Sequence, residues 1–237
     1  MTHEQRQRVF IVNNSVARLL KIRVLLQSVG LVAETYGTPG EFLENHDVSH
    51  SGCLILGLRL PQMSGLEVFR RLRRQGDLIP VIFFTEHGDV ATAVTAMREG
   101  AFDFLEASTG EQHLLDRVNA ALRKDREIRA KTAERMAAAA RIGQLSPRER
   151  AVLDLLMAGK GSKDIARELE ATPKTVDVHR ANILKKVDVE SVAQLVCLYF
   201  IAGLAETRCR KEPLQPESPP AGCSDNAGGI LQGAARR

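Results

Sequence analysis

Few features of this 237-residue sequence indicate a metalloprotein or a membrane protein. The four cysteines show no metal-ligand spacing, and they are Cys53, Cys197, Cys209 and Cys223. Cys53 and Cys197 lie in apolar runs typical of core thiols. No apolar run reaches the roughly 18 residues of a membrane span, and no signal-peptide pattern opens the chain. We therefore expect a cytoplasmic protein with no metal, no cofactor and no membrane partner.

The net charge is also small. A net charge of +4 is too small for a polycation that binds nucleic acid regardless of sequence. The hydrophobic residues, 44% of the chain, suffice to form apolar cores. The charge is unevenly distributed. Residues 1–110 carry 11 basic and 12 acidic side chains, whereas residues 111–141 carry 8 and 5. The positive excess therefore precedes the region from residue 145, where it suits phosphate contacts, although a solvated helix face explains it equally well.

Residues 145–203 contain three short helical patterns and a fourth packing helix. Ser146 and Glu149 have the spacing of a capping box at the first helix. The second helix is expected to begin at Ser162, and the third opens at Thr172, followed by a proline. This spacing is typical of a helix-turn-helix, which predicts DNA binding.

The third helix has an apolar side and an unusual polar side. Val176, Ile183 and Val187 share one side and are expected to face the core. Val178 and Ala181 lie opposite them between lysines, as suits a helix in a major groove, where small apolar groups contact thymine methyls. The residues expected at base edges are Lys174, Thr175, Asp177, Val178 and Ala181. Those expected nearer the DNA backbone are Arg180, Asn182 and Lys185.

The same region resembles the LuxR/FixJ-type helix-turn-helix. The matching elements are Ser146-Pro147-Arg148-Glu149-Arg150, Ile165-Ala166, Lys174-Thr175-Val176, Val178-His179-Arg180 and Lys185-Lys186. The resemblance implies a homodimer on promoter DNA, with RNA polymerase as a further partner. The alternative is a small helical bundle that merely packs against a neighbouring domain.

The chain before residue 122 alternates short apolar runs with helical patterns. Strands are expected at 9–12, 31–36, 53–58, 81–84 and 102–105, and helices at 15–28, 39–44, 64–75, 89–99 and from 110. In the first helix, Leu19, Ile22, Leu26 and Val29 are expected to share the buried face. This alternation predicts an α/β fold, with a parallel sheet covered on both faces in the flavodoxin-like, doubly wound order. Functional residues then belong at the carboxyl ends of the strands.

These segments resemble a FixJ-type receiver domain of a two-component response regulator, notably VFIVNN, GCLILGLRLPQMSGLEV and PVIFFTEHGDVATAVTAMREGAFDFLEA. Together the two resemblances cover roughly residues 7–204. An ordinary receiver phosphorylates an aspartate after its third strand, with an acidic pair that holds Mg²⁺, a Ser or Thr, and a Lys. The aligned positions here are Gly57 for the nucleophile, Asn13 and Asn14 for the acidic pair, Thr85 for the hydroxyl and Ala107 for the lysine.

Of these positions, only Thr85 has the residue type that the resemblance implies. Gly57 has no side chain to phosphorylate, Asn13 and Asn14 are neutral amides, and Ala107 supplies no cation. The sequence therefore predicts a receiver that works without aspartyl phosphorylation, a pseudo-receiver. With this nucleophile absent and no other catalytic constellation visible, we expect no enzyme.

The segments predict four regions. They are a receiver-like domain at 7–122, a linker helix at 123–141, a LuxR-type helix-turn-helix domain at 142–205 and a disordered tail at 206–237. Residues 111–141 lack glycine and proline, which predicts that the last receiver helix runs on into the linker. The sustained heptads of a coiled coil are absent.

Three functions remain open. The first is a sequence-specific regulator that binds promoter DNA as a homodimer and works without phosphorylation. The second is a regulator whose receiver surface senses a protein partner or an unknown ligand, such as an anion or an aromatic molecule, although the sequence defines no pocket for it. The third is an interaction protein that sequesters a related regulator and no longer binds DNA. The well-formed outward face of the third helix counts against the third function.

Overall fold

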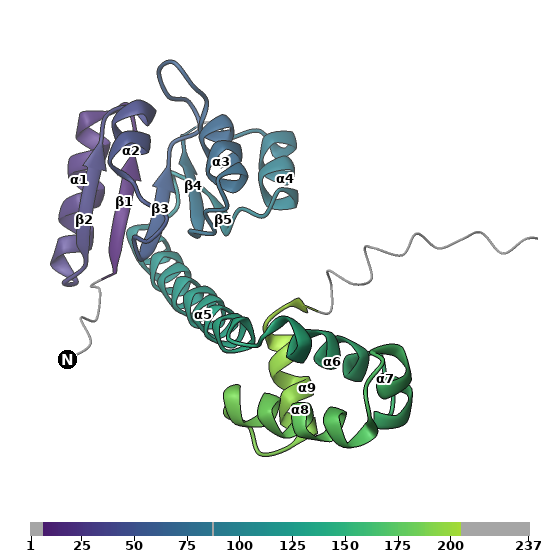
Figure 1. Cartoon of the computed structure of the whole chain (residues 1–237). Helices are drawn as coiled ribbons and strands as arrows, with labels where there is room; N and C mark the ends of the chain where they lie inside the picture. Colours follow the sequence, from purple (N-terminus) through teal and green to yellow (C-terminus); the bar gives the residue numbers. More distant parts are fainter. Residues whose placement is uncertain (1–6, 87, 205–237) are drawn as a thin grey trace, which may run out of the picture. The chain divides into compact units, whose positions relative to one another are not determined.

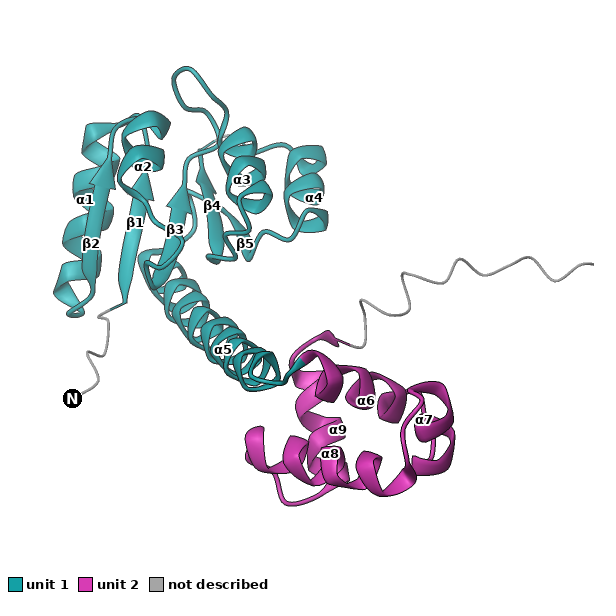
Figure 2. Ribbon diagram, viewed as in Figure 1, with its two compact units in different colours: residues 1–146 teal, residues 147–237 magenta. Residues whose placement is uncertain are grey.

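The chain forms two compact units, residues 1–146 and 147–237, in the computed structural model (Figures 1 and 2). The structure describes residues 7–86 and 88–204. The predicted disordered tail at 206–237, with Cys209 and Cys223, lies outside the described residues. No helix in the described ranges is long and apolar enough to cross a membrane.

The first unit is built on a five-stranded parallel sheet in the order β2-β1-β3-β4-β5. The strands are β1 Arg8–Val12, β2 Val32–Tyr36, β3 Gly52–Leu56, β4 Val81–Thr85 and β5 Asp103–Glu106. Every residue of β3 and β4 is buried, which explains why these strands read as continuous apolar runs. The predicted α/β fold and its flavodoxin-like strand order are confirmed.

Helices cover both faces of this sheet (Figure 1). They are α1 Val16–Ser28, α2 Pro39–Asn45, α3 Gly65–Arg74, α4 Val90–Arg98 and α5 Glu111–Gly143. Because neighbouring strand residues point to opposite faces, Ile11 and Ile55 belong to the core under α1 and α5. Phe10 and Leu54 belong to the core under α2 and α3. One detail of the prediction was wrong: Val29 is 51% exposed, because α1 ends at Ser28 and Val29 forms its cap.

The second unit is all helical. Its helices are α6 Pro147–Met157, α7 Ser162–Glu168, α8 Pro173–Lys186 and α9 Val192–Ile201. Thr172 caps α8 as predicted, since its side chain accepts a hydrogen bond from the Thr175 amide. The prediction that Cys197 is a core thiol was wrong, because Cys197 is exposed on α9, whereas Leu195 and Leu198 are buried. The run from Val192 is apolar almost throughout, so its composition did not reveal which side faces the core.

Candidate functional site

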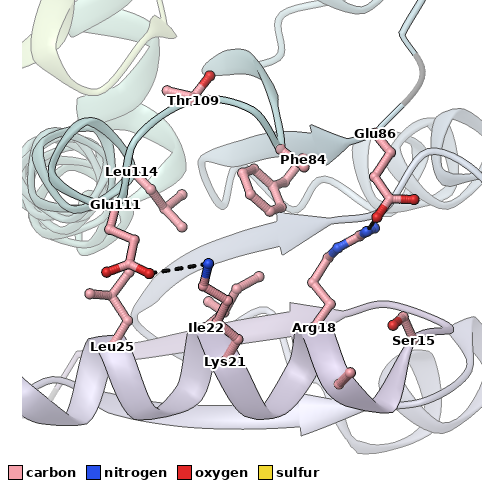
Figure 3. Close-up of a pocket in the computed structure, with 12 residues that line it drawn as sticks. Ser15, Arg18, Lys21, Ile22, Leu25, Phe84, Glu86, Thr109, Glu111 and Leu114 are labelled. Carbon is pink, nitrogen blue, oxygen red and sulfur yellow. Dashed lines mark ion pairs between the residues drawn. The ribbon is translucent and has the colours of Figure 1, made fainter.

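The sheet register brings the predicted receiver residues together. Val12 pairs with Leu56, and the Gly57 amide donates to the Val12 carbonyl at 2.9 Å, which places Asn13 beside Gly57. The residues Asn13, Asn14, Gly57 and Thr85 line one cavity of about 200 Å³. Ala107 lines an adjoining cavity of about 330 Å³ between α1 and the start of α5 (Figure 3).

The backbone at Gly57 is closely surrounded. A Cβ atom there would lie 2.9 Å from Asn13 Nδ2, 3.2 Å from Leu60 Cδ2 and 3.3 Å from the Val12 carbonyl oxygen. Asn13 is only 4% exposed, and its Oδ1 atom accepts a hydrogen bond from the Ser15 amide at 2.9 Å. An aspartate at position 57 therefore requires Asn13 to move.

The charge around this position does not suit a divalent cation. Of the residues that line the smaller cavity, Glu86 alone is acidic, whereas Arg18 and Arg59 are basic. Glu86 forms an ion pair with Arg18 (Figure 3). Mg²⁺ binds carboxylate oxygens and is repelled by neighbouring guanidinium groups. The Mg²⁺ that the receiver fold implies therefore does not fit these residues.

Phe104 on β5 is partly buried and packs inward. Its ring centroid lies 5.9 Å from that of Phe83, and the side chain packs against the core on the α2, α3 and α4 side. Gly88 lies directly against the ring, since a Cβ there would be 2.5 Å from Phe104 Cε1. These contacts make Phe104 a partly buried neighbour of that core.

The helix predicted to enter DNA is α8, and its two sides differ in burial. Val176, Ile183 and Val187 are fully buried, whereas Val178 is 54% exposed. Arg180 is partly buried. The other residues assigned to the DNA contact are exposed, and they are Lys174, Thr175, Asp177, Ala181, Asn182 and Lys185. Small apolar groups and lysines thus occupy one solvent-facing side of the helix.

Ser162 at the start of α7 organises part of this face. Its hydroxyl donates to Asp177 Oδ1 at 2.8 Å and accepts from Arg180 Nη1 at 2.8 Å. The sequence analysis placed Ser162 only at a helix start and missed this bridge. On another side of α8, Lys186 donates to the buried Glu149 of α6 at 2.8 Å, so this lysine joins two helices.

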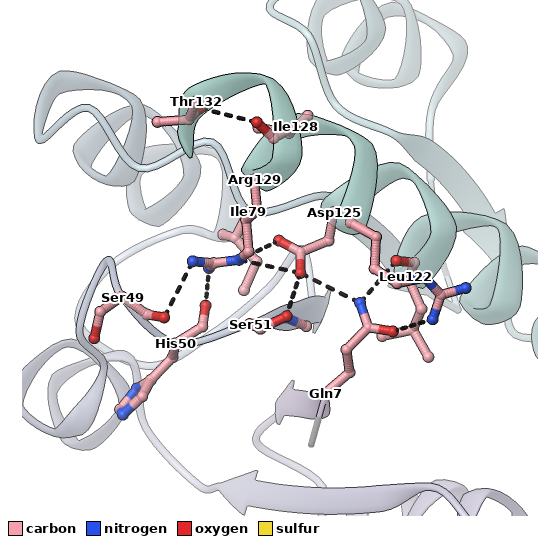
Figure 4. A network of polar contacts seen from close by, with 12 residues as sticks. Gln7, Ser49, His50, Ser51, Ile79, Leu122, Asp125, Ile128, Arg129 and Thr132 are labelled. Atoms are coloured by element: carbon pink, nitrogen blue, oxygen red, sulfur yellow. Dashed lines mark hydrogen bonds and ion pairs between the residues drawn. The ribbon is translucent and has the colours of Figure 1, made fainter. Parts of the chain in front are cut away.

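A second feature missed by the sequence analysis is a polar clamp between α5 and the start of β3 (Figure 4). Asp125, 2% exposed, accepts hydrogen bonds from the Ser51 hydroxyl at 2.6 Å and the Gly52 amide at 2.9 Å. Arg129 pairs with Asp125 at 3.0 Å and donates to the Ser49 carbonyl. The receiver's contacts thus continue into the segment predicted as the linker helix.

Two family models match the chain. The response regulator receiver domain matches residues 9–119, and the bacterial regulatory proteins of the luxR family match residues 143–199. The chain belongs to the LuxR-type response regulators. This response regulator therefore combines a receiver with a DNA-binding helix-turn-helix, the architecture of transcription regulators in two-component systems.

Similar proteins share both parts of the response regulator. The transcriptional regulatory protein FixJ of Bradyrhizobium diazoefficiens is 34% identical, over 83% of this chain and 96% of its own. The response regulator protein TodT of Pseudomonas putida is 37% identical, over 79% of this chain and 83% of its own length. The solved structure of the response regulator StyR has a TM-score of 0.72 at 37% identity, covering 82% of this chain and 98% of its own.

Proposed function

We propose that this response regulator binds promoter DNA as a homodimer and controls transcription without aspartyl phosphorylation. The observation that carries the second part of the proposal is the surroundings of Gly57. Asn13 packs against the position at which a nucleophile would stand, and Arg18 and Arg59 stand near it where a metal site needs acids. An acyl phosphate needs a carboxylate nucleophile, which residue 57 does not offer.

The consequence for signalling follows from population shifts. A phosphodonor changes the equilibrium between two conformations only if it interacts differently with them. With no carboxylate at Gly57, no covalent phosphoryl group distinguishes two states of this receiver. Operator affinity is then independent of phosphodonors, and regulation acts through protein abundance, a ligand or a partner at the receiver surface.

The DNA-binding part of the proposal rests on α8. Val178 and Ala181 are exposed between Lys174 and Lys185, an arrangement that suits thymine methyls flanked by phosphates. An interaction protein that only sequesters another regulator has no need of this face. We further propose RNA polymerase as a partner, because a promoter-bound regulator of this architecture acts on it.

Phosphorylation is tested on the full-length protein with acetyl phosphate and Mg²⁺, followed by intact mass spectrometry. The wild type is expected to gain no phosphoryl group, and the Gly57→Asp variant is expected to be phosphorylated only inefficiently, because the acidic pair and the lysine are still absent. The comparison protein carries four changes that restore every group of an ordinary receiver: Asn13→Asp, Asn14→Asp, Gly57→Asp and Ala107→Lys. Efficient mass gain by this variant alone supports the proposal. A base-labile phosphoryl group on the wild type, accompanied by tighter operator binding, contradicts it.

The assembly on DNA is tested by selecting a preferred site from random DNA and footprinting it. A homodimer predicts two half-sites whose centres lie about 10 bp apart or a multiple of that. Protection of a single half-site at saturating protein concentration would show that the homodimer proposal is wrong.

A further inference from the structure

The two adjoining cavities at the carboxyl ends of the strands differ in chemical character. Both are lined by Arg18, Phe84 and Glu86, so they form one carboxyl-edge cleft with two parts. The smaller part is polar and contains Asn13, Arg59 and Thr85. The larger part has an apolar floor, which Figure 3 shows between α1 and α5, made of Ile22, Leu25, Phe84 and Leu114.

The polar part favours an anion. Arg18 and Arg59 line it with a single acidic residue, Glu86, and within the described residues no ion pair involves Arg59. The side chain of Glu86 is 57% exposed and that of Arg18 is 18% exposed, so water screens the Glu86 end of this ion pair and weakens it. A better-placed anion can therefore replace Glu86 on Arg18. Lys21 adds a further positive charge at the rim, where it pairs with Glu111 at 3.2 Å.

The apolar part of the cleft is lined by the short side chain of Ala107 and by larger apolar side chains. The side chains of Ile22, Phe84 and Leu114 are at least nine-tenths buried, yet each lines the cavity. An apolar group placed against them is itself removed from water, which contributes roughly 25 cal/mol per Å² of its own apolar surface. The combined cleft has the size of a small-molecule site, a few hundred Å³, and its charged lining residues are Arg18, Lys21, Arg59, Glu86 and Glu111.

We propose that the carboxyl-edge cleft reversibly binds a small organic anion, with no covalent bond and no Mg²⁺. The anionic group lies at Arg18 and Arg59, and an apolar body lies against Ile22, Phe84 and Leu114. This inference rests on the proposed function, because it assigns a non-covalent ligand to the edge of the sheet where an ordinary receiver is phosphorylated.

The test measures probe binding to the full-length protein by calorimetry, with amide chemical shifts in labelled protein to locate the probe. The probes are phenyl phosphate, hexanoate, inorganic phosphate and benzyl alcohol, all with EDTA present. Phenyl phosphate is expected to bind at least tenfold tighter than inorganic phosphate or benzyl alcohol, because each of these lacks one half of the recognised structure. Hexanoate distinguishes whether the cleft also accepts a carboxylate.

Substitutions test the polar and the apolar part of the cleft separately. Arg18→Gln is expected to weaken phenyl phosphate binding about tenfold or more, because hydrogen bonds to charged groups are stronger than those between neutral groups. Arg18→Lys keeps the positive charge, so its affinity is expected to lie between those of the wild type and Arg18→Gln. Arg23→Gln, on the same helix but outside the cleft, is the matched control and leaves binding unchanged. Ala107→Leu fills the apolar part, so it weakens phenyl phosphate binding but not that of inorganic phosphate.

Several results overturn the inference. The first is that neither phenyl phosphate nor hexanoate binds saturably at millimolar concentration. The second is that phenyl phosphate binds the wild type and Arg18→Gln equally well. The third is that phenyl phosphate binds no tighter than inorganic phosphate. A requirement for Mg²⁺ also overturns it. If the wild type binds none of the probes and also gains no covalent phosphoryl group, only this inference is rejected. If the wild type gains a covalent phosphoryl group, the proposed function is rejected.

Discussion

Removal of the Asp125 carboxylate is expected to destabilise the receiver unit by about 3 kcal/mol. The Asp125→Ala substitution leaves the buried Gly52 amide without its acceptor at 2.9 Å and removes the acceptor of the Ser51 hydroxyl. Each buried unsatisfied group costs about 1–3 kcal/mol, and the Ser51 hydroxyl can rotate toward another acceptor. Arg129 is 31% exposed and also donates to backbone carbonyl groups, so its lost pairing adds less than a fully buried ion pair would.

Asp125→Asn provides a graded comparison. The amide keeps one oxygen for Gly52 and Ser51 but presents N–H groups toward the guanidinium of Arg129. About 1–2 kcal/mol of destabilisation is expected, because only part of the hydrogen bonding is lost. Asp116→Ala is the matched control, since Asp116 lies on α5, is exposed and accepts a hydrogen bond from Gln112 at 3.0 Å. Its effect should stay within about 0.5 kcal/mol.

Hydrogen–deuterium exchange of the full-length protein measures this effect for each unit separately. If exchange of the β3 amides requires unfolding of the receiver unit, 3 kcal/mol corresponds to about 100-fold faster exchange in Asp125→Ala. Peptides from α8 serve as an internal control and should not change. Exchange in β1 and β3 within threefold of the wild-type rate would refute the assigned role of Asp125.

Further predictions concern the second unit and the two described cysteines. Val178→Asp should weaken binding to the selected operator by about 1–3 kcal/mol and affect other sequences less, as a binding titration would reveal. Lys185→Ala should weaken binding to all sequences and reduce the slope of affinity against salt by about one; an unchanged slope would remove Lys185 from the phosphate contacts. Burial raises the pKa of the Cys53 thiol, so peptide-resolved iodoacetamide labelling of the native protein should modify the exposed Cys197 and spare Cys53. Rapid native labelling of Cys53 would contradict its burial.

Local sequence patterns determined the elements and much of their orientation. The 3.6-residue period placed Val176 and Ile183 in the core and Val178 outside, because helix geometry fixes these directions without help from distant residues. Continuous apolar runs marked β3 and β4, since strands covered on both faces have no polar side. The resemblance to receiver domains assigned Asn13 and Gly57 to one site, and the strand register places the two residues side by side.

Contacts between distant segments decided what these patterns left open. Asp125 stands in a charged stretch that the sequence assigned to a linker, yet its carboxylate is buried because residues 51 and 52, far away in the chain, supply its hydrogen-bond donors. Cys197 lies in a run with no clear period, so only packing within the second unit left it exposed. The cleft beside Ala107 likewise exists because α1, β4 and α5 meet there. Burial and cavity shape are sums over residues remote in sequence, and no local pattern contains them.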